Sequence, residues 1–67
     1  MLDLTRRERE ICDLLLQALS NREIADRLDT TEAAVKECLW RVFLRNGIDP
    51  HRNRRVLLAV LYYAEKI

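Results

Sequence analysis

Hydrophobic residues recur along the chain at the three- and four-residue spacing that is typical of amphipathic helices. This spacing predicts helices at about residues 5–18, 21–28, 32–46 and 54–65. In the first of them the expected inward residues are Ile11, Leu14, Leu15 and Ala18. We therefore expect an all-α protein, a four-helix bundle that forms one domain over residues 1–67.

Residues that cap helices support these boundaries. Glu8 and Glu23 each follow a hydroxyl residue by three positions, which is the pattern of a capping box. The expected N-caps of the helices are Thr5, Ser20, Thr31 and Asn53. Gly47 can end the third helix, because glycine adopts the left-handed conformation without a Cβ clash. The charged residues 6–10 are expected to form a solvated first turn.

The second and third predicted helices are separated only by the residues between Leu28 and Thr31. Such a short connection makes the two helices cross steeply, which is the helix-turn-helix arrangement. Ala25 suits a close crossing because its side chain is small. Asn46 lies on the inward stripe of the third helix, where it would place a polar group at a core position.

The outer face of the third predicted helix combines charge with large apolar groups. Its residues are Ala33, Lys36, Glu37, Trp40, Arg41 and Leu44. A merely solvated face does not need a tryptophan and a leucine beside its charges. This composition indicates a surface that contacts another molecule.

The fourth predicted helix is apolar on all sides from Val56 to Ala64. A helix of this kind is buried all round, and in so short a chain only one side can face the core. We expect the other side to face a second copy of the chain. The expected dimer contacts are Val56, Leu58, Leu61 and Tyr62, with Leu58 and Tyr62 pointing outward.

Several classes of function are disfavoured by composition. No apolar run approaches the roughly 20 residues of a membrane span, and no signal-peptide pattern is present, so a cytoplasmic protein without membrane contact is expected. Cys12 and Cys38 are expected to be small buried hydrophobes, although a disulfide between them remains open. With His51 they offer only three scattered ligands, so we expect no metal and no cofactor. No catalytic constellation surrounds His51, and we expect no enzymatic activity.

Charge is distributed unevenly along the chain. Residues 1–35 hold five basic and eight acidic groups, whereas residues 36–55 hold six basic and two acidic groups. The overall formal charge is only +1, but the second half is strongly basic. This asymmetry indicates a polyanionic partner for that half.

Four blocks of sequence carry a resemblance to a known family. They are Leu4-Thr5-Arg6-Arg7-Glu8-Arg9-Glu10-Ile11, Ser20-Asn21-Arg22-Glu23-Ile24-Ala25-Asp26-Arg27-Leu28, Val35-Lys36, and Phe43 with Gly47-Ile48. Together they resemble the LuxR-type (GerE-like) helix-turn-helix from Leu4 to Ile48 without a gap. The resemblance implies a bacterial transcription regulator that binds double-stranded DNA as a dimer, often through its fourth helix.

The resemblance also implies roles for single residues. The third helix would enter the major groove, and the positions that touch bases or phosphates would be Ala34, Val35, Lys36, Arg41 and Arg45. The start of the second helix would meet the DNA backbone through Ser20, Asn21 and Arg22.

The chemistry of the outer face agrees with these roles. Lys36 or Arg41 could bind guanine, and Ala33 or Trp40 could pack on a thymine methyl group. Arg52, Arg54 and Arg55 form a second basic cluster that could reach a flanking phosphate. A purely structural alternative is that Arg41 and Arg45 pair with Glu37 on the same helix.

Two alternative functions remain open. The same fold could be a protein-interaction module that uses Trp40 and Leu44 as apolar anchors. It could also be a promoter-recognition module similar to region 4 of a sigma factor, which shares the LTxRERE and EIAxxL patterns. The apolar fourth helix disfavours the sigma-factor alternative.

Overall fold

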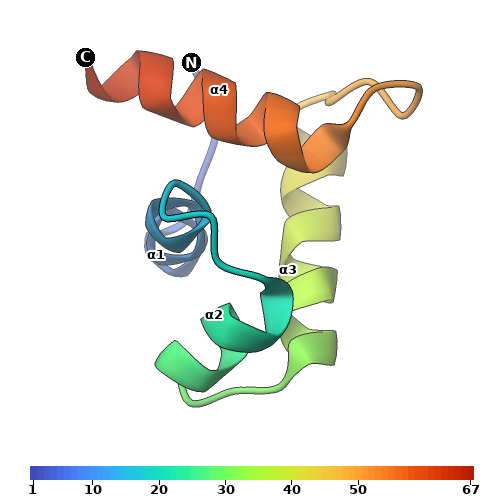
Figure 1. Cartoon of the computed structure of the whole chain (residues 1–67). Helices are drawn as coiled ribbons and strands as arrows, with labels where there is room; N and C mark the ends of the chain where they lie inside the picture. Colours follow the sequence, from blue (N-terminus) through green and yellow to red (C-terminus); the bar gives the residue numbers. More distant parts are fainter.

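The computed structural model describes all of residues 1–67. It contains four helices and no strand: α1 (Arg6–Leu15), α2 (Asn21–Arg27), α3 (Glu32–Arg45) and α4 (Arg54–Lys66). Figure 1 shows α3 upright, α2 beside its lower end, and α4 lying across the other end of α3 and over α1. The all-α, four-helix prediction is confirmed. No helix is long and apolar enough to span a bilayer.

The turn between α2 and α3 is closed by backbone hydrogen bonds. Thr30 N–H donates to the Ala25 carbonyl at 2.9 Å, and Asp29 N–H donates to the Asp26 carbonyl at 3.4 Å. This pair of bonds is a Schellman motif, which requires a left-handed residue. Asp29 fills that position with φ 54°, and aspartate tolerates it better than most residues. Thr31 then caps α3 by accepting from Ala34 N–H at 3.1 Å.

Gly47 ends α3 as expected. It has φ 61°, and the Ile48 N–H donates to the Phe43 carbonyl at 2.9 Å. The chain therefore turns sharply toward α4 after Gly47, and Ile48 enters the core.

α1 ends earlier than the hydrophobic pattern predicts. Its last helical residue is Leu15, followed by turn residues. Ala18, which was expected inside the helix on its inward face, is exposed and has φ 61°. The left-handed conformation turns the chain toward Ser20, so the prediction for Ala18 is wrong.

An Ala18→Gly substitution should stabilise the protein. A left-handed backbone costs an L-residue with a Cβ about 1–2 kcal/mol, whereas glycine adopts it freely. Part of that gain is offset because glycine also has more freedom in the unfolded chain, so we expect a net rise of about 0.5–1 kcal/mol in unfolding free energy. Urea denaturation followed by circular dichroism would measure it. Ala59→Gly, inside a helix, should destabilise instead.

The core receives side chains from all four helices and from the segments that flank them. Its buried apolar members are Leu2, Ile11, Cys12, Leu15, Ile24, Ala25, Val35, Leu39, Val42, Ile48, Leu58 and Tyr62. Cys12 is buried and Cys38 is half-buried, and both are free thiols. Burial raises the pKa of Cys12 to about 12, so this thiol stays protonated and acts as a small hydrophobe.

The structure corrects the expected orientation of α4. Leu58 and Tyr62 were expected to point outward, but they are 0% and 3% exposed and face the core. They lie one turn apart on the same side of the helix, where they meet α1. The Tyr62 hydroxyl donates to the Asp13 carboxylate at 2.6 Å, and Lys66 donates to the same oxygen at 2.9 Å. These contacts fasten α4 to α1.

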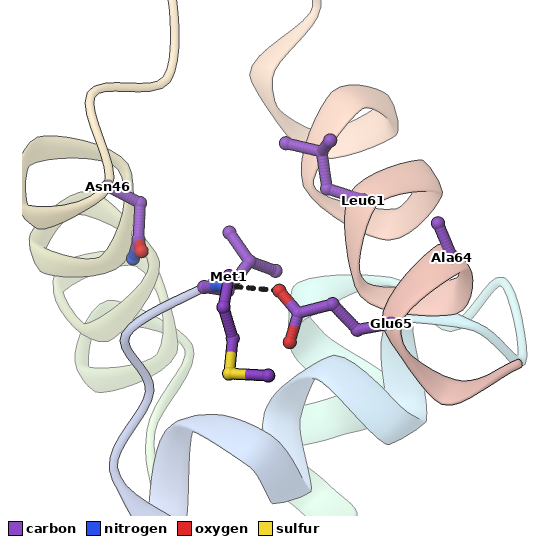
Figure 2. A pocket seen from close by; sticks show the side chains of 6 residues that line it. Met1, Asn46, Leu61, Ala64 and Glu65 are labelled. Carbon is purple, nitrogen blue, oxygen red and sulfur yellow. Dashed lines mark hydrogen bonds between the residues drawn. The ribbon is translucent and has the colours of Figure 1, made fainter.

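The N-terminal segment is fastened between the ends of α3 and α4. Asn46 accepts from Asp3 N–H at 2.6 Å and donates to the Asp3 and Val42 carbonyls. The polar group at this inward position is therefore satisfied by backbone partners. A neighbouring open cavity has a volume of about 400 Å³, and Figure 2 shows Asn46, Leu61 and Glu65 around it. Leu2 N–H donates to Glu65 at this cavity.

Candidate nucleic-acid interface

The outer face of α3, defined as Ala33, Lys36, Glu37, Trp40, Arg41 and Leu44, is exposed along its whole length. Both α2 and α3 begin at capped ends. At the start of α2, Ser20 and Glu23 form the expected capping box, with bonds of 2.9 and 3.1 Å. α3 packs inward through Val35, Leu39 and Val42, which leaves its opposite side uncovered by the rest of the chain.

Trp40 and Leu44 are the large apolar groups of the outer face of α3. Their exposed fractions are 51% and 60%. They stand one helical turn apart, so together they form an apolar strip among charged neighbours. A half-exposed tryptophan with this placement suits contact with a second molecule.

The two cations of the outer face each have a carboxylate partner on the same helix. The Lys36 Nζ atom lies 3.3 Å from Glu32 Oε2, and the Arg41 Nη2 atom lies 2.6 Å from Glu37 Oε1. The pairing of Arg41 with Glu37 is therefore observed. Because all four side chains are largely exposed, each pair contributes only about 0.3–0.5 kcal/mol. Phosphate groups can compete for these cations at little cost.

Two residues implied as DNA contacts lie at the first turn of α3, and the structure separates them. Ala34 is exposed, and its implied role stays a prediction. Val35 is only 1% exposed and belongs to the core. Its side chain cannot reach a base while the fold is intact, so the assignment of Val35 to the contact surface is wrong.

Arg45 is held by the protein itself. Its guanidinium donates to both oxygens of the Glu8 carboxylate, at 2.6 and 2.9 Å, and to the Asp3 carbonyl at 3.0 Å. Glu8 is only 4% exposed, so it alone departs from the expected solvated first turn, whereas Arg6, Arg7, Arg9 and Glu10 are exposed. The expected partner Glu37 is not the one that Arg45 uses. Arg45 therefore joins α3 to α1 and is not free for phosphate.

Electrostatics at this pair follow from the same geometry. The hydrogen bonds from Arg45 lower the pKa of Glu8 below its usual value of 4.5, against the opposing effect of burial. Glu8 also accepts from Thr5 N–H at 2.8 Å, which completes the capping box of α1. One carboxylate thus caps α1 and anchors the end of α3.

The three residues at the start of α2 differ in whether their side chains already have a partner within the protein. Arg22 is exposed and has no intramolecular ion pair. Ser20 is exposed, but its hydroxyl is used as the N-cap. Asn21 is half-buried and accepts from the Arg55 guanidinium. Only Arg22 therefore offers an unoccupied side chain to a backbone phosphate.

The second basic cluster does not behave as a unit. Arg52 is exposed and lies 3.8 Å from Asp49. Arg55 donates to Asn21 and to the Leu19 carbonyl, at 2.5 Å for the latter, so it links α4 to the start of α2. Arg54 is placed over the ring of Trp40. No sequence pattern predicts this contact, because the two residues are far apart in the chain and on different helices.

Comparison with known proteins adds the family. Residues 2–45 match the model of the GerE domain, described as bacterial regulatory proteins, luxR family. No curated protein and no solved structure matches the chain. The matched region contains the complete helix-turn-helix and covers well over half of the sequence. The chain therefore belongs to the LuxR family of bacterial regulatory proteins, whose GerE domain is a DNA-binding helix-turn-helix.

Proposed function

We propose that this protein regulates transcription by inserting α3 into the major groove of double-stranded DNA as a homodimer. The observation that supports this most is the outer face of α3, which is uncovered along its length and carries Lys36 and Arg41. A helix of 14 residues fits the major groove, which is about 12 Å wide. We place the protein in the bacterial cytoplasm, at the nucleoid when it is bound to DNA.

Each exposed side chain has a distinct role in this proposal. Lys36 binds phosphate, and Arg41 binds the edge of a guanine or a phosphate. Arg22 and the start of α2 contact the DNA backbone, which sets the angle at which α3 enters the groove. Glu37 keeps Arg41 extended beside the groove wall, and its own negative charge opposes close phosphate contact there.

The dimer contact in this proposal is an apolar stripe on the outward side of α4. The stripe consists of Val56, Val60, Tyr63 and Ile67, which are all exposed. Leu61 is 38% exposed, but it lines the cavity beside the N-terminal segment. Contiguous apolar groups of this kind are typical of interaction surfaces. A symmetric dimer through α4 would present two copies of α3 to the two halves of a site.

A second candidate function is supported by Trp40 and Leu44. These two side chains give the outer face of α3 an apolar strip that phosphate does not need, and tryptophan is common at the centre of protein interfaces. In this alternative, α3 docks a protein partner. Salt separates the two candidates, because DNA binding weakens steeply as salt rises and apolar docking does not.

The proposed function is tested by a salt titration of binding to a labelled duplex, using fluorescence anisotropy. We expect wild-type affinity to fall steeply with salt. Lys36→Ala should lower the slope of log affinity against log salt by about 1. If Arg41 binds guanine, Arg41→Ala should cost roughly 1–3 kcal/mol and relax the preference at one base position.

The matched control for these variants is Arg27→Ala, which removes an exposed cation outside α3. It should leave the sequence preference unchanged. Unaltered binding by a Lys36→Ala, Arg41→Ala double variant would exclude the outer face of α3 as the DNA surface.

A further inference from the structure

Arg54 differs from the other basic residues in the second half of the chain. Four of the six basic side chains in residues 36–55 have a carboxylate partner, namely Lys36, Arg41, Arg45 and Arg52. Arg55 has none, but it donates to Asn21 and to the Leu19 carbonyl. Arg54 alone has neither a carboxylate partner nor a hydrogen-bond acceptor within the protein.

The position of Arg54 is set by two aromatic rings. Its guanidinium carbon lies 5.0 Å from the centre of the Trp40 ring and 5.6 Å from the centre of the Phe43 ring. Both distances are within the roughly 6 Å of a cation–π contact. Arg54 is the first residue of α4, so these ring contacts join the start of α4 to α3. The stack therefore brings a charge from α4 to the outer face of α3.

Stacking leaves the donor groups of Arg54 available. The N–H groups of a guanidinium lie in its plane, and a contact with an aromatic ring does not use them as a hydrogen bond to an acceptor would. Nε is buried without a partner, but the two terminal nitrogens are not among the buried unpaired atoms. These terminal nitrogens can bind the two oxygens of a phosphate in the same plane.

We propose that Arg54, held on the ring of Trp40, is a phosphate-binding residue of the DNA interface, and that Trp40 positions it. This inference rests on the proposed function. It assigns Trp40 a role as the platform for a cation, in place of direct contact with a thymine methyl group. It also connects α4 to DNA contact, because the phosphate ligand is the first residue of that helix.

Salt-titrated duplex binding by Arg54 variants tests the inference. Arg54→Gln should lower the slope of log affinity against log salt by about 1, with unchanged helical content. Arg54→Lys retains the charge and should retain the slope. Arg9→Gln removes an exposed cation of α1 that has no ion pair, and it should change the slope little. If Arg54 had a purely structural role, Arg54→Gln and Arg54→Lys would both keep the wild-type salt slope.

The single tryptophan of the chain gives a second readout. Arg54→Gln should shift the fluorescence emission of Trp40 without DNA, because it removes the stacked guanidinium. Two results in Arg54→Gln would overturn this inference and leave the proposed function standing. One is an unchanged emission spectrum, and the other is an unchanged salt slope while the wild type binds the duplex. Absence of salt-dependent binding by the wild type would overturn the proposed function, and this inference with it.

Discussion

Arg45→Met should lower the free energy of unfolding by about 3 kcal/mol, because it leaves the buried carboxylate of Glu8 without its partner. Glu8 is only 4% exposed and accepts both hydrogen bonds of the guanidinium. Methionine keeps much of the apolar stem, so the loss reports the charge pair and not a large cavity. Chemical denaturation at pH 7 would measure it. A change below about 1 kcal/mol would contradict the proposed importance of this pair.

The pH dependence of stability should weaken in the same variant. In the wild type the pKa of Glu8 lies below its usual value of 4.5, so its contribution to stability is present above that pH and is lost as pH falls through the folded-state pKa. Without Arg45 the largest cause of the lowered pKa is gone, while burial still raises the pKa of Glu8 and the Thr5 hydrogen bonds still lower it, so acidification should cost the variant less stability than it costs the wild type. A Glu8→Gln, Arg45→Met double variant should recover much of the stability, because no buried charge remains.

Val60→Lys should convert the proposed dimer to a monomer. Val60 lies in the middle of the α4 stripe and is 58% exposed, so the substitution leaves the core intact. In the dimer it would bury a charge without a partner, which costs several kcal/mol. Sedimentation equilibrium at high micromolar concentration should show a dimer for the wild type and a monomer for the variant. A wild type that sediments as a monomer would contradict the dimer proposal.

Leu44→Lys is the matched control for Val60→Lys. Leu44 is 60% exposed, but it lies on the outer face of α3 and away from the α4 stripe. The variant should remain a dimer. Loss of self-association in Leu44→Lys instead of Val60→Lys would move the interface to α3 and favour the protein-interaction alternative.

Local chemistry allowed the first residues of the helices to be predicted. The boxes at Thr5 and Ser20 and the cap at Thr31 depend on residues within three positions of one another, and all are observed. The predicted end of α1 at residue 18 was wrong, because α1 ends at Leu15 and no local pattern marks that end. Ala18 has no local signal for a left-handed conformation, and its position depends on how the following turn packs.

The side of a helix that faces the core was predictable only where polar and apolar residues alternate. α3 has such a pattern, and its outer face is exposed as expected. α4 is apolar on all sides, so the pattern could not distinguish buried Leu58 and Tyr62 from exposed Val60 and Tyr63. Packing against α1 makes that choice. Long-range side-chain contacts such as Glu8 with Arg45, and Arg54 with Trp40, leave no periodic signal at all.

Mapping the duplex contact by NMR tests the central claim most directly, and a chain of 8.0 kDa is well suited to it. Backbone amide shifts would be recorded while an unlabelled DNA duplex is added to the labelled protein. The proposal predicts that the largest changes lie at Ala33–Arg41 on α3 and at Ser20–Arg22, with small changes along Val60–Lys66 of α4. Changes confined to α4, or no changes at low salt, would contradict the docking of α3 on DNA.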